Sequence, residues 1–274
     1  MKRSLATKHT REITASDAIH AIDNAATRSV EEVMDYVYRT VRGDEWDTQP
    51  ACWITDYILG VQCFVSVASV LMFTSDNERS DDAFWSIFYL VVMGATATLG
   101  GLLHHVAFKA QTRFTTSDAD ATRCRRVFGL YVTQPTVDRA MRWMWRFVLG
   151  LTTLSNFCLI AGIAQRHLSA HVSTWIIFVA AVAYSGIAAT AFFTMATSIM
   201  LVGFLPPLCF GSVAALSTLK STWAFEVVAL LFILAGGVIQ AVQVSPSREH
   251  FNHNALAHLF LCASISTMTW QLYF

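Results

Sequence analysis

The chain has 274 residues, of which 54% are hydrophobic and only 14% are charged, whereas soluble domains carry about a quarter charged residues. Lys and Arg together number 19, as do Asp and Glu, so the formal net charge is zero and no basic excess points to nucleic acid as a partner. These values exclude an ordinary soluble domain and indicate an integral membrane protein, whose organisation is read from hydropathy.

Residues 1–52 are polar and are predicted to form a soluble, amphipathic helical N-terminal extension. Ser29 and Glu32 have the spacing of a capping box, and valines follow at helical spacing. Because such an apolar stripe needs cover, we expect the extension to contact membrane lipids or to bind other membrane protein subunits. Acidic residues soon follow the basic start, so we expect no secretory signal peptide.

Long apolar runs fill residues 53–274, which we predict to be an all-α, seven-transmembrane-helix domain. Residues 173–219 form one apolar stretch that is too long for a single span at about 1.5 Å rise per residue. We expect two helices there, with a break between Thr194 and Pro207, because Pro206-Pro207 is unfavourable inside a helix. The other expected spans cover residues 53–73, 84–108, 143–165, 223–243 and 254–273, and six spans is the competing count.

The depth of the polar residues favours seven spans over six. Asp56 lies near the start of the first span, and His104 and His105 lie near the end of the second, on the same membrane side. With seven spans, His253 and His258 reach that depth too, whereas six spans would place them at the opposite face. Ionisable groups inside a bilayer are costly and usually pair or bind something, so a common depth is the cheaper arrangement.

The charged loops predict an orientation. The longest loop carries several arginines on the side that holds the N-terminus, and residues 75–82 on the other side are acidic. By the positive-inside rule, the N-terminus lies in the cytosol or, in a mitochondrion, in the matrix.

The histidines predict a metal site, with Asp56 as its carboxylate. Neutral imidazole is a common zinc ligand, and three His leave one position for a water whose pKa zinc lowers to about 7. His253 and His258 are five residues apart, so they converge only if His253 lies on the turn before the helix. Asn254 and His258 are four apart and share a helix face. The alternative, which spacing alone leaves open, is that these groups hydrogen-bond one another or the loop backbone.

Three short stretches carry a family resemblance: Thr55-Asp56, Gly100-Gly101-Leu102-Leu103-His104 and Phe251-Asn252-His253-Asn254-Ala255-Leu256-Ala257-His258. Together they resemble the CREST superfamily of seven-span membrane proteins, which includes alkaline ceramidases and the progestin and adipoQ receptors. The resemblance implies zinc held by three histidines, which map onto His104, His253 and His258.

The chain also departs from the pattern of those relatives that hydrolyse lipid amides. Gly100-Gly101 stands where they have a serine, and Asn254 aligns with the first His of their HxxxH pair. The groups that would orient the ligands and the water are therefore reduced.

We therefore expect a non-catalytic accessory or structural subunit of a larger membrane assembly. A respiratory or ATP synthase complex of the mitochondrial inner membrane is the expected setting, and an endomembrane is the alternative. The alternative function is a zinc-dependent, ceramidase-like hydrolase of lipid amides, in which Asp56 would be catalytic as general base or would orient a ligand. A third possibility, a receptor-like protein, has no discriminating residue in this chain.

Overall fold

The computed structural model describes residues 49–73, 81–114, 125–195, 197–218, 223–242, 244–247 and 251–272. All of them belong to the compact unit Trp46–Phe274. The helix predicted from Ser29 onward and the contacts expected of the N-terminal extension lie outside the described residues.

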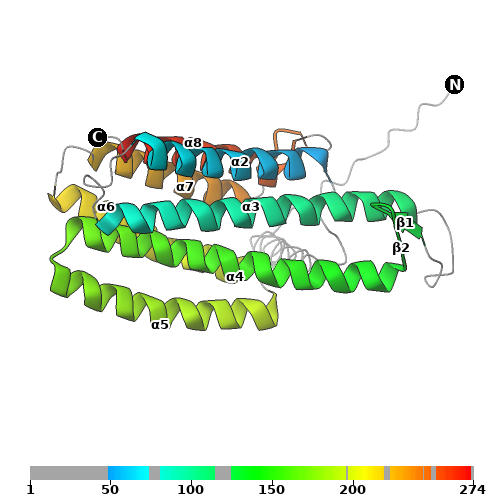
Figure 1. Ribbon diagram of the computed structural model, residues 1–274, viewed down its shortest axis with the longest axis horizontal. Helices are drawn as coiled ribbons and strands as arrows, with labels where there is room; N and C mark the ends of the chain where they lie inside the picture. The colour runs from blue at the N-terminus through cyan, green and yellow to red at the C-terminus, as the bar shows by residue number, and fades with distance from the viewer. Residues whose placement is uncertain are drawn as a thin grey trace, which may run out of the picture. The chain divides into compact units, whose positions relative to one another are not determined.

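Seven helices make up nearly all of the described chain (Figure 1). Five of them, α2, α3, α4, α5 and α7, are long and apolar enough to cross a membrane. In α6 the apolar stretch is shorter, Val202–Ser217, and α8 is not among the five, so a multi-pass membrane protein is supported while the count of seven spans stays a prediction. The helices are α2 (Pro50–Phe73), α3 (Asp81–Phe114), α4 (Gln134–His167), α5 (Ala170–Thr194), α6 (Thr197–Thr218), α7 (Trp223–Val242) and α8 (His253–Gln271).

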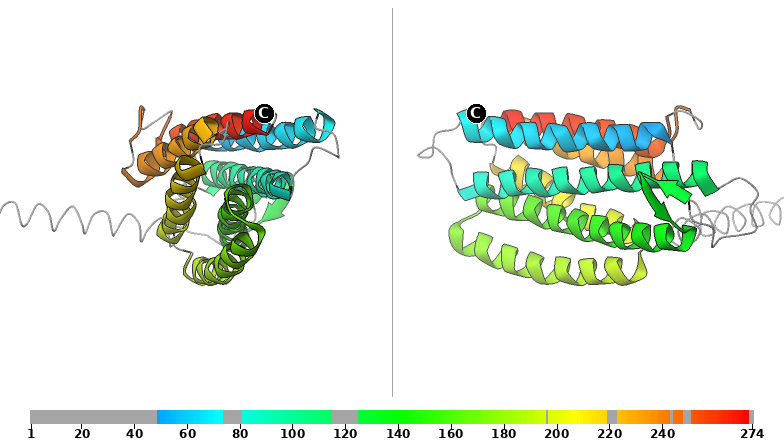
Figure 2. Two further views of the ribbon diagram at one scale, coloured as in Figure 1. Left: turned by 90° about the vertical axis from the view of Figure 1, so that its left-hand side faces the viewer. Right: turned by 45° about the vertical axis from the view of Figure 1, so that its right-hand side comes forward.

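Six of the helices form a closed ring in which α2, α3, α4, α6, α7 and α8 each pack against the next, and α8 returns to α2 (Figure 2). The centre of the ring is apolar and includes Leu59, Leu90, Leu159, Ile233 and Ile265. Helix α5 lies outside the ring, mainly against α4. Only 17% of its apolar window is buried, against 72% for α4, so the described chain leaves most of the apolar surface of α5 uncovered.

The break within residues 173–219 falls at Met195, which follows α5 with a left-handed φ of 58°. This position lies within the expected interval. The expectation that a helix would avoid Pro206 and Pro207 is wrong, however, because both lie inside α6.

A side chain from α5 helps α6 to continue through its prolines. Pro207 has no N–H to donate to the carbonyl of Gly203, one helical turn earlier. The hydroxyl of Tyr184 donates to that carbonyl instead, at 2.6 Å. A hydrogen bond from a neighbouring helix thus replaces the missing backbone hydrogen bond. The amino-acid sequence of α6 alone could not reveal this donor.

Replacing Tyr184 with phenylalanine is therefore expected to lower the free energy of unfolding by about 1–3 kcal/mol, because a buried carbonyl loses its donor. The measurement is SDS-induced unfolding in mixed micelles. The exposed Tyr131 offers the matched control, and its change to phenylalanine should have little effect. Equal losses at the two positions would contradict the role given to Tyr184.

A short hairpin occupies part of the arginine-rich loop. Strands β1 (Arg125–Val127) and β2 (Leu130–Val132) pair antiparallel, joined by Phe128 and Gly129. Both turn residues have positive φ, 49° and 85°, as a two-residue hairpin of this kind requires. Phenylalanine is unusual at such a position, which explains why the sequence carries only a weak turn signal there.

Candidate functional site

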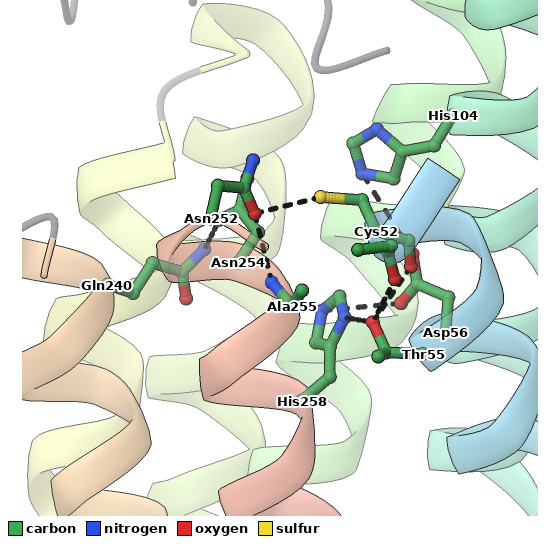
Figure 3. Close-up of polar contacts among 10 residues, drawn as sticks. Cys52, Thr55, Asp56, His104, Gln240, Asn252, Asn254, Ala255 and His258 are labelled. Atoms are coloured by element: carbon green, nitrogen blue, oxygen red, sulfur yellow. Dashed lines mark hydrogen bonds and ion pairs between the residues drawn. The ribbon is translucent and has the colours of Figure 1, made fainter. Parts of the chain in front are cut away.

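A carboxylate between two imidazoles forms the candidate site (Figure 3). Asp56 lies near the start of α2, and its Oδ1 is 3.3 Å from Nε2 of His258 on α8. Its Oδ2 is 3.9 Å from Nε2 of His104 on α3. The structure thus brings together three of the four predicted site residues, from helices far apart in the sequence.

Two glycines on α3 let the Asp56 side chain lie deep between the helices. A methyl group at Gly101 would come within 3.0 Å of Asp56 Cβ and of the Tyr57 ring. At Gly100 it would stand 3.4 Å from Asp56 Oδ2. This close approach leaves Asp56 only 4% exposed, so α2 and α3 hold the carboxylate away from solvent.

The Gly101→Ala variant is expected to unfold more easily than wild type by about 1–3 kcal/mol, because the new methyl overpacks the α2–α3 contact. Gly237→Ala makes the same chemical change where nothing lies within 4 Å, and serves as the control. Thermal unfolding in detergent tests the pair. If both variants gained stability, as alanine in a helix ordinarily allows, the close packing at Gly101 would be refuted.

Thr55 sets the orientation of the His258 ring. Its Oγ1 lies 3.1 Å from Nδ1 of His258 and 2.7 Å from the carbonyl of Ala51, to which it can donate. A hydroxyl has one hydrogen, so donation to Ala51 makes it the acceptor of Nδ1–H and leaves the Nε2 lone pair directed at Asp56. In the other tautomer, Nε2–H donates to the carboxylate. The first state suits a metal ligand, and the second suits an Asp–His hydrogen bond.

His253 takes a different position from the one expected. It begins α8, and its backbone N–H donates to Ser245 Oγ at 3.1 Å, with its Nδ1 3.5 Å from the same oxygen. His253 thus lies in the helix and not on the turn before it, and Asn252 caps α8 by accepting a hydrogen bond from the N–H of Ala255. Among the described residues, His253 contacts Ser245, and no contact there joins it to Asp56.

Neighbouring polar groups extend the site to α7. The Cys52 thiol donates to Asn252 Oδ1 at 3.0 Å, and Gln240 of α7 donates to Asn254 Oδ1 at 3.2 Å. Asn254 and His258 therefore contact different helices although they are four residues apart. A role for Cys52 was missed, but its spacing of four residues before Asp56 placed it on the same helix face.

His105 is separate from this cluster. Its ring stacks on Trp53 with centroids 4.6 Å apart and meets Phe128 edge-on at 5.0 Å. Adjacent residues of a helix point in different directions, so His104 and His105 cannot both face Asp56.

The site contains zinc-type donors in an incomplete arrangement. Two ligands of one tetrahedral zinc ion lie about 3.3–3.4 Å apart, a spacing that His258 and Asp56 match at 3.3 Å. The 3.9 Å between His104 and Asp56 is longer. Within the described ranges, no three His, Cys, Asp or Glu side chains are already placed to hold a metal together. The three-histidine zinc site stays a prediction.

A bundle of apolar helices around a buried carboxylate and two imidazoles defines a multi-pass α-helical membrane protein with a polar site inside the bundle. A sequence model of the family of unknown function DUF6962 matches residues 51–272, so this chain belongs to that family. The match runs from the start of α2 to the end of α8. No curated protein and no solved structure matches the chain.

Proposed function

We propose that this protein is a non-catalytic structural subunit of a larger membrane assembly, and that it binds a metal ion, zinc in the first instance, at Asp56, His104 and His258. The observation that carries the proposal is the Asp56 carboxylate lying between two imidazole Nε2 atoms. Imidazole nitrogen and carboxylate oxygen are donors that zinc accepts. An ion held there would link α2, α3 and α8, which otherwise meet around a buried charge.

Two features favour a structural role over catalysis. Two cavities of the described chain are lined by other residues, whereas a hydrolase needs room for its substrate beside the reacting groups. Structural zinc sites are closed by four protein ligands. Cys52, one helical turn before Asp56 and buried, carries a thiol of the kind that zinc prefers, and this thiol would have to turn from Asn252 Oδ1 to reach the ion.

Metal analysis of protein purified in mild detergent tests the site. We expect an equimolar amount of zinc in the wild type, and loss of most of it in Asp56→Asn and in His258→Leu. His105→Leu is the matched control, because His105 stacks on Trp53 away from Asp56, and it should keep the metal. Wild-type protein without metal, still folded by circular dichroism, would refute the metal part of the proposal.

The assembly part of the proposal is supported by large apolar helix surfaces, since only 17% of the apolar window of α5 and 28% of that of α7 are buried within the chain. Such faces can contact lipid or neighbouring subunits. We propose that the N-terminal extension binds the other subunits. The proposed setting is the mitochondrial inner membrane, with the N-terminus on the matrix side. Native purification with mass spectrometry tests it: we expect a stable large complex, and a lone chain would overturn the subunit role.

The second candidate is a zinc-dependent hydrolase of lipid amides. It is favoured by the donor set of two His and one Asp, because three protein ligands with an open position are typical of catalytic zinc sites. Bound zinc would supply Lewis acidity and a water of lowered pKa. If His104, His253 and His258 held the ion instead, as the family resemblance implies, Asp56 would be free to orient a ligand or to accept a proton as general base. Turnover of a ceramide-like amide that disappears in His258→Ala would establish this function over the first.

A further inference from the structure

A second buried polar cluster lies at the other end of the bundle from Asp56. Glu226, in the first turn of α7, is 4% exposed. Its Oε2 accepts hydrogen bonds from Gln271 Nε2 at 3.0 Å and pairs with His167 Nε2 at 2.9 Å. Gln271 and His258 are thirteen residues apart on α8, or about 20 Å at the α-helical rise, which separates the two clusters.

Among the described residues, the Glu226 carboxylate has a permanent cationic partner. Arg166 Nη1 lies 3.6 Å from the same Oε2, and its Nη2 donates to Ser86 Oγ on α3 at 3.3 Å. The Glu226 carboxylate thus faces the Arg166 guanidinium. Four helices, α3, α4, α7 and α8, meet at this network.

One oxygen of the Glu226 carboxylate is left over. Within the described part of the chain, Oε1 is buried and has no hydrogen-bond partner. A buried carboxylate oxygen without a donor is costly, so one that has no protein donor points to an ordered water or another bound group as its partner. Glu226 also lines a cavity of about 20 Å³, together with Ser86, Gly162, Arg166 and Gln271.

The size and charge of the cavity restrict what can occupy it. A water molecule needs about 10–15 Å³ measured with a water-sized sphere, so the space suits one water or one group of that size. A cation would meet Arg166, and an anion would meet Glu226. The occupant is therefore neutral, and Oε1 requires it to be a hydrogen-bond donor.

We propose that the Glu226 cavity is a binding site for one neutral hydroxyl group, which donates a hydrogen bond to Glu226 Oε1. Solvent water and the terminal hydroxyl of a lipid headgroup share this chemistry. The bound hydroxyl completes the network that joins α3, α4, α7 and α8 at this end of the bundle. This site is independent of the metal proposed at Asp56.

A wild-type structure in lipid nanodiscs, at a resolution that shows ordered water, tests the proposal. We expect density within hydrogen-bond distance of Glu226 Oε1. Isolated density identifies water as the source, and density continuous with a glycerol headgroup identifies lipid. An empty cavity beside a well-ordered Oε1 would overturn the proposal.

Two matched variants on α4 provide a second measurement. Gly162→Ala adds a methyl at the cavity wall, 3.7 Å from Ser86 Oγ and no closer than 3.4 Å to any neighbour, so the protein should fold. Gly150→Ala adds the same methyl where nothing lies within 4 Å. The density should disappear in Gly162→Ala and persist in Gly150→Ala. Alanine in a helix ordinarily raises the thermal midpoint relative to glycine, and this rise should be smaller for Gly162→Ala because it also displaces the bound hydroxyl. Unchanged density in Gly162→Ala would count against the site.

Discussion

Replacing His258 with leucine is expected to lower the free energy of unfolding by about 3–5 kcal/mol, because it leaves a buried carboxylate with one fewer compensating group. Asp56 is 4% exposed, and Nε2 of His258 is the closer of its two imidazole partners, at 3.3 Å. The measurement is SDS-induced unfolding of protein pretreated with a chelator, so that the result reports the protein groups alone.

The double variant Asp56→Asn/His258→Leu distinguishes this cause from simple loss of packing. It removes the charge together with its partner, so we expect it to be more stable than His258→Leu alone. The coupling between the two positions should be about 0.5–3 kcal/mol. Additive losses would mean that His258 stabilises the bundle by packing and that the carboxylate–imidazole contact contributes little.

The Glu226→Leu variant is also expected to lower the free energy of unfolding by about 3–5 kcal/mol. Here the group that loses a compensating charge is a largely buried cation and not a buried carboxylate. Leucine would remove the carboxylate that faces the Arg166 guanidinium, whose side chain is 12% exposed. It would also remove the acceptor of Gln271 and the partner of His167. Thermal unfolding in detergent gives the comparison with wild type.

Glu226→Gln is the matched control at this position. Glutamine removes the charge as leucine does, but it has nearly the same shape as glutamate and keeps one carbonyl oxygen that can accept a hydrogen bond. Its loss of stability should therefore be smaller than that of leucine, and the loss that remains measures the contribution of the charge. Equal stabilities of wild type and Glu226→Leu would show that the cluster is held by the surrounding helices and not by its ion pairs.

The placement of the site could be predicted from sequence because it depends on helix register and membrane depth. Asp56 lies one turn into its helix and His104 about one turn from the predicted end of another, so a bilayer brings them to one level. His258 follows by the same argument once an odd number of helices separates it from Asp56. The observed 3.3 and 3.9 Å contacts agree with that depth argument, while the metal and the reaction stay predictions.

Other features could not be predicted because they depend on partners from distant helices. Pro206 and Pro207 lie inside α6 although proline disfavours helices, and a hydroxyl from α5 supplies the donor for Gly203. His253 was expected beside Asp56, but it begins α8 and its backbone N–H donates to Ser245. The four-helix network around Glu226 likewise emerged only in the structure.

Hydropathy and the spacing of a few ionisable residues determined the class of this protein and the level at which its buried groups gather. Both are properties of the chain taken one helix at a time, since apolar length sets a span and periodicity sets a face. Which side chains pair at that level, and which helix covers which, was decided by the tertiary structure. A buried polar group pairs with a side chain of the helix packed beside it, and which helices are neighbours is set by the ring from α2 to α8.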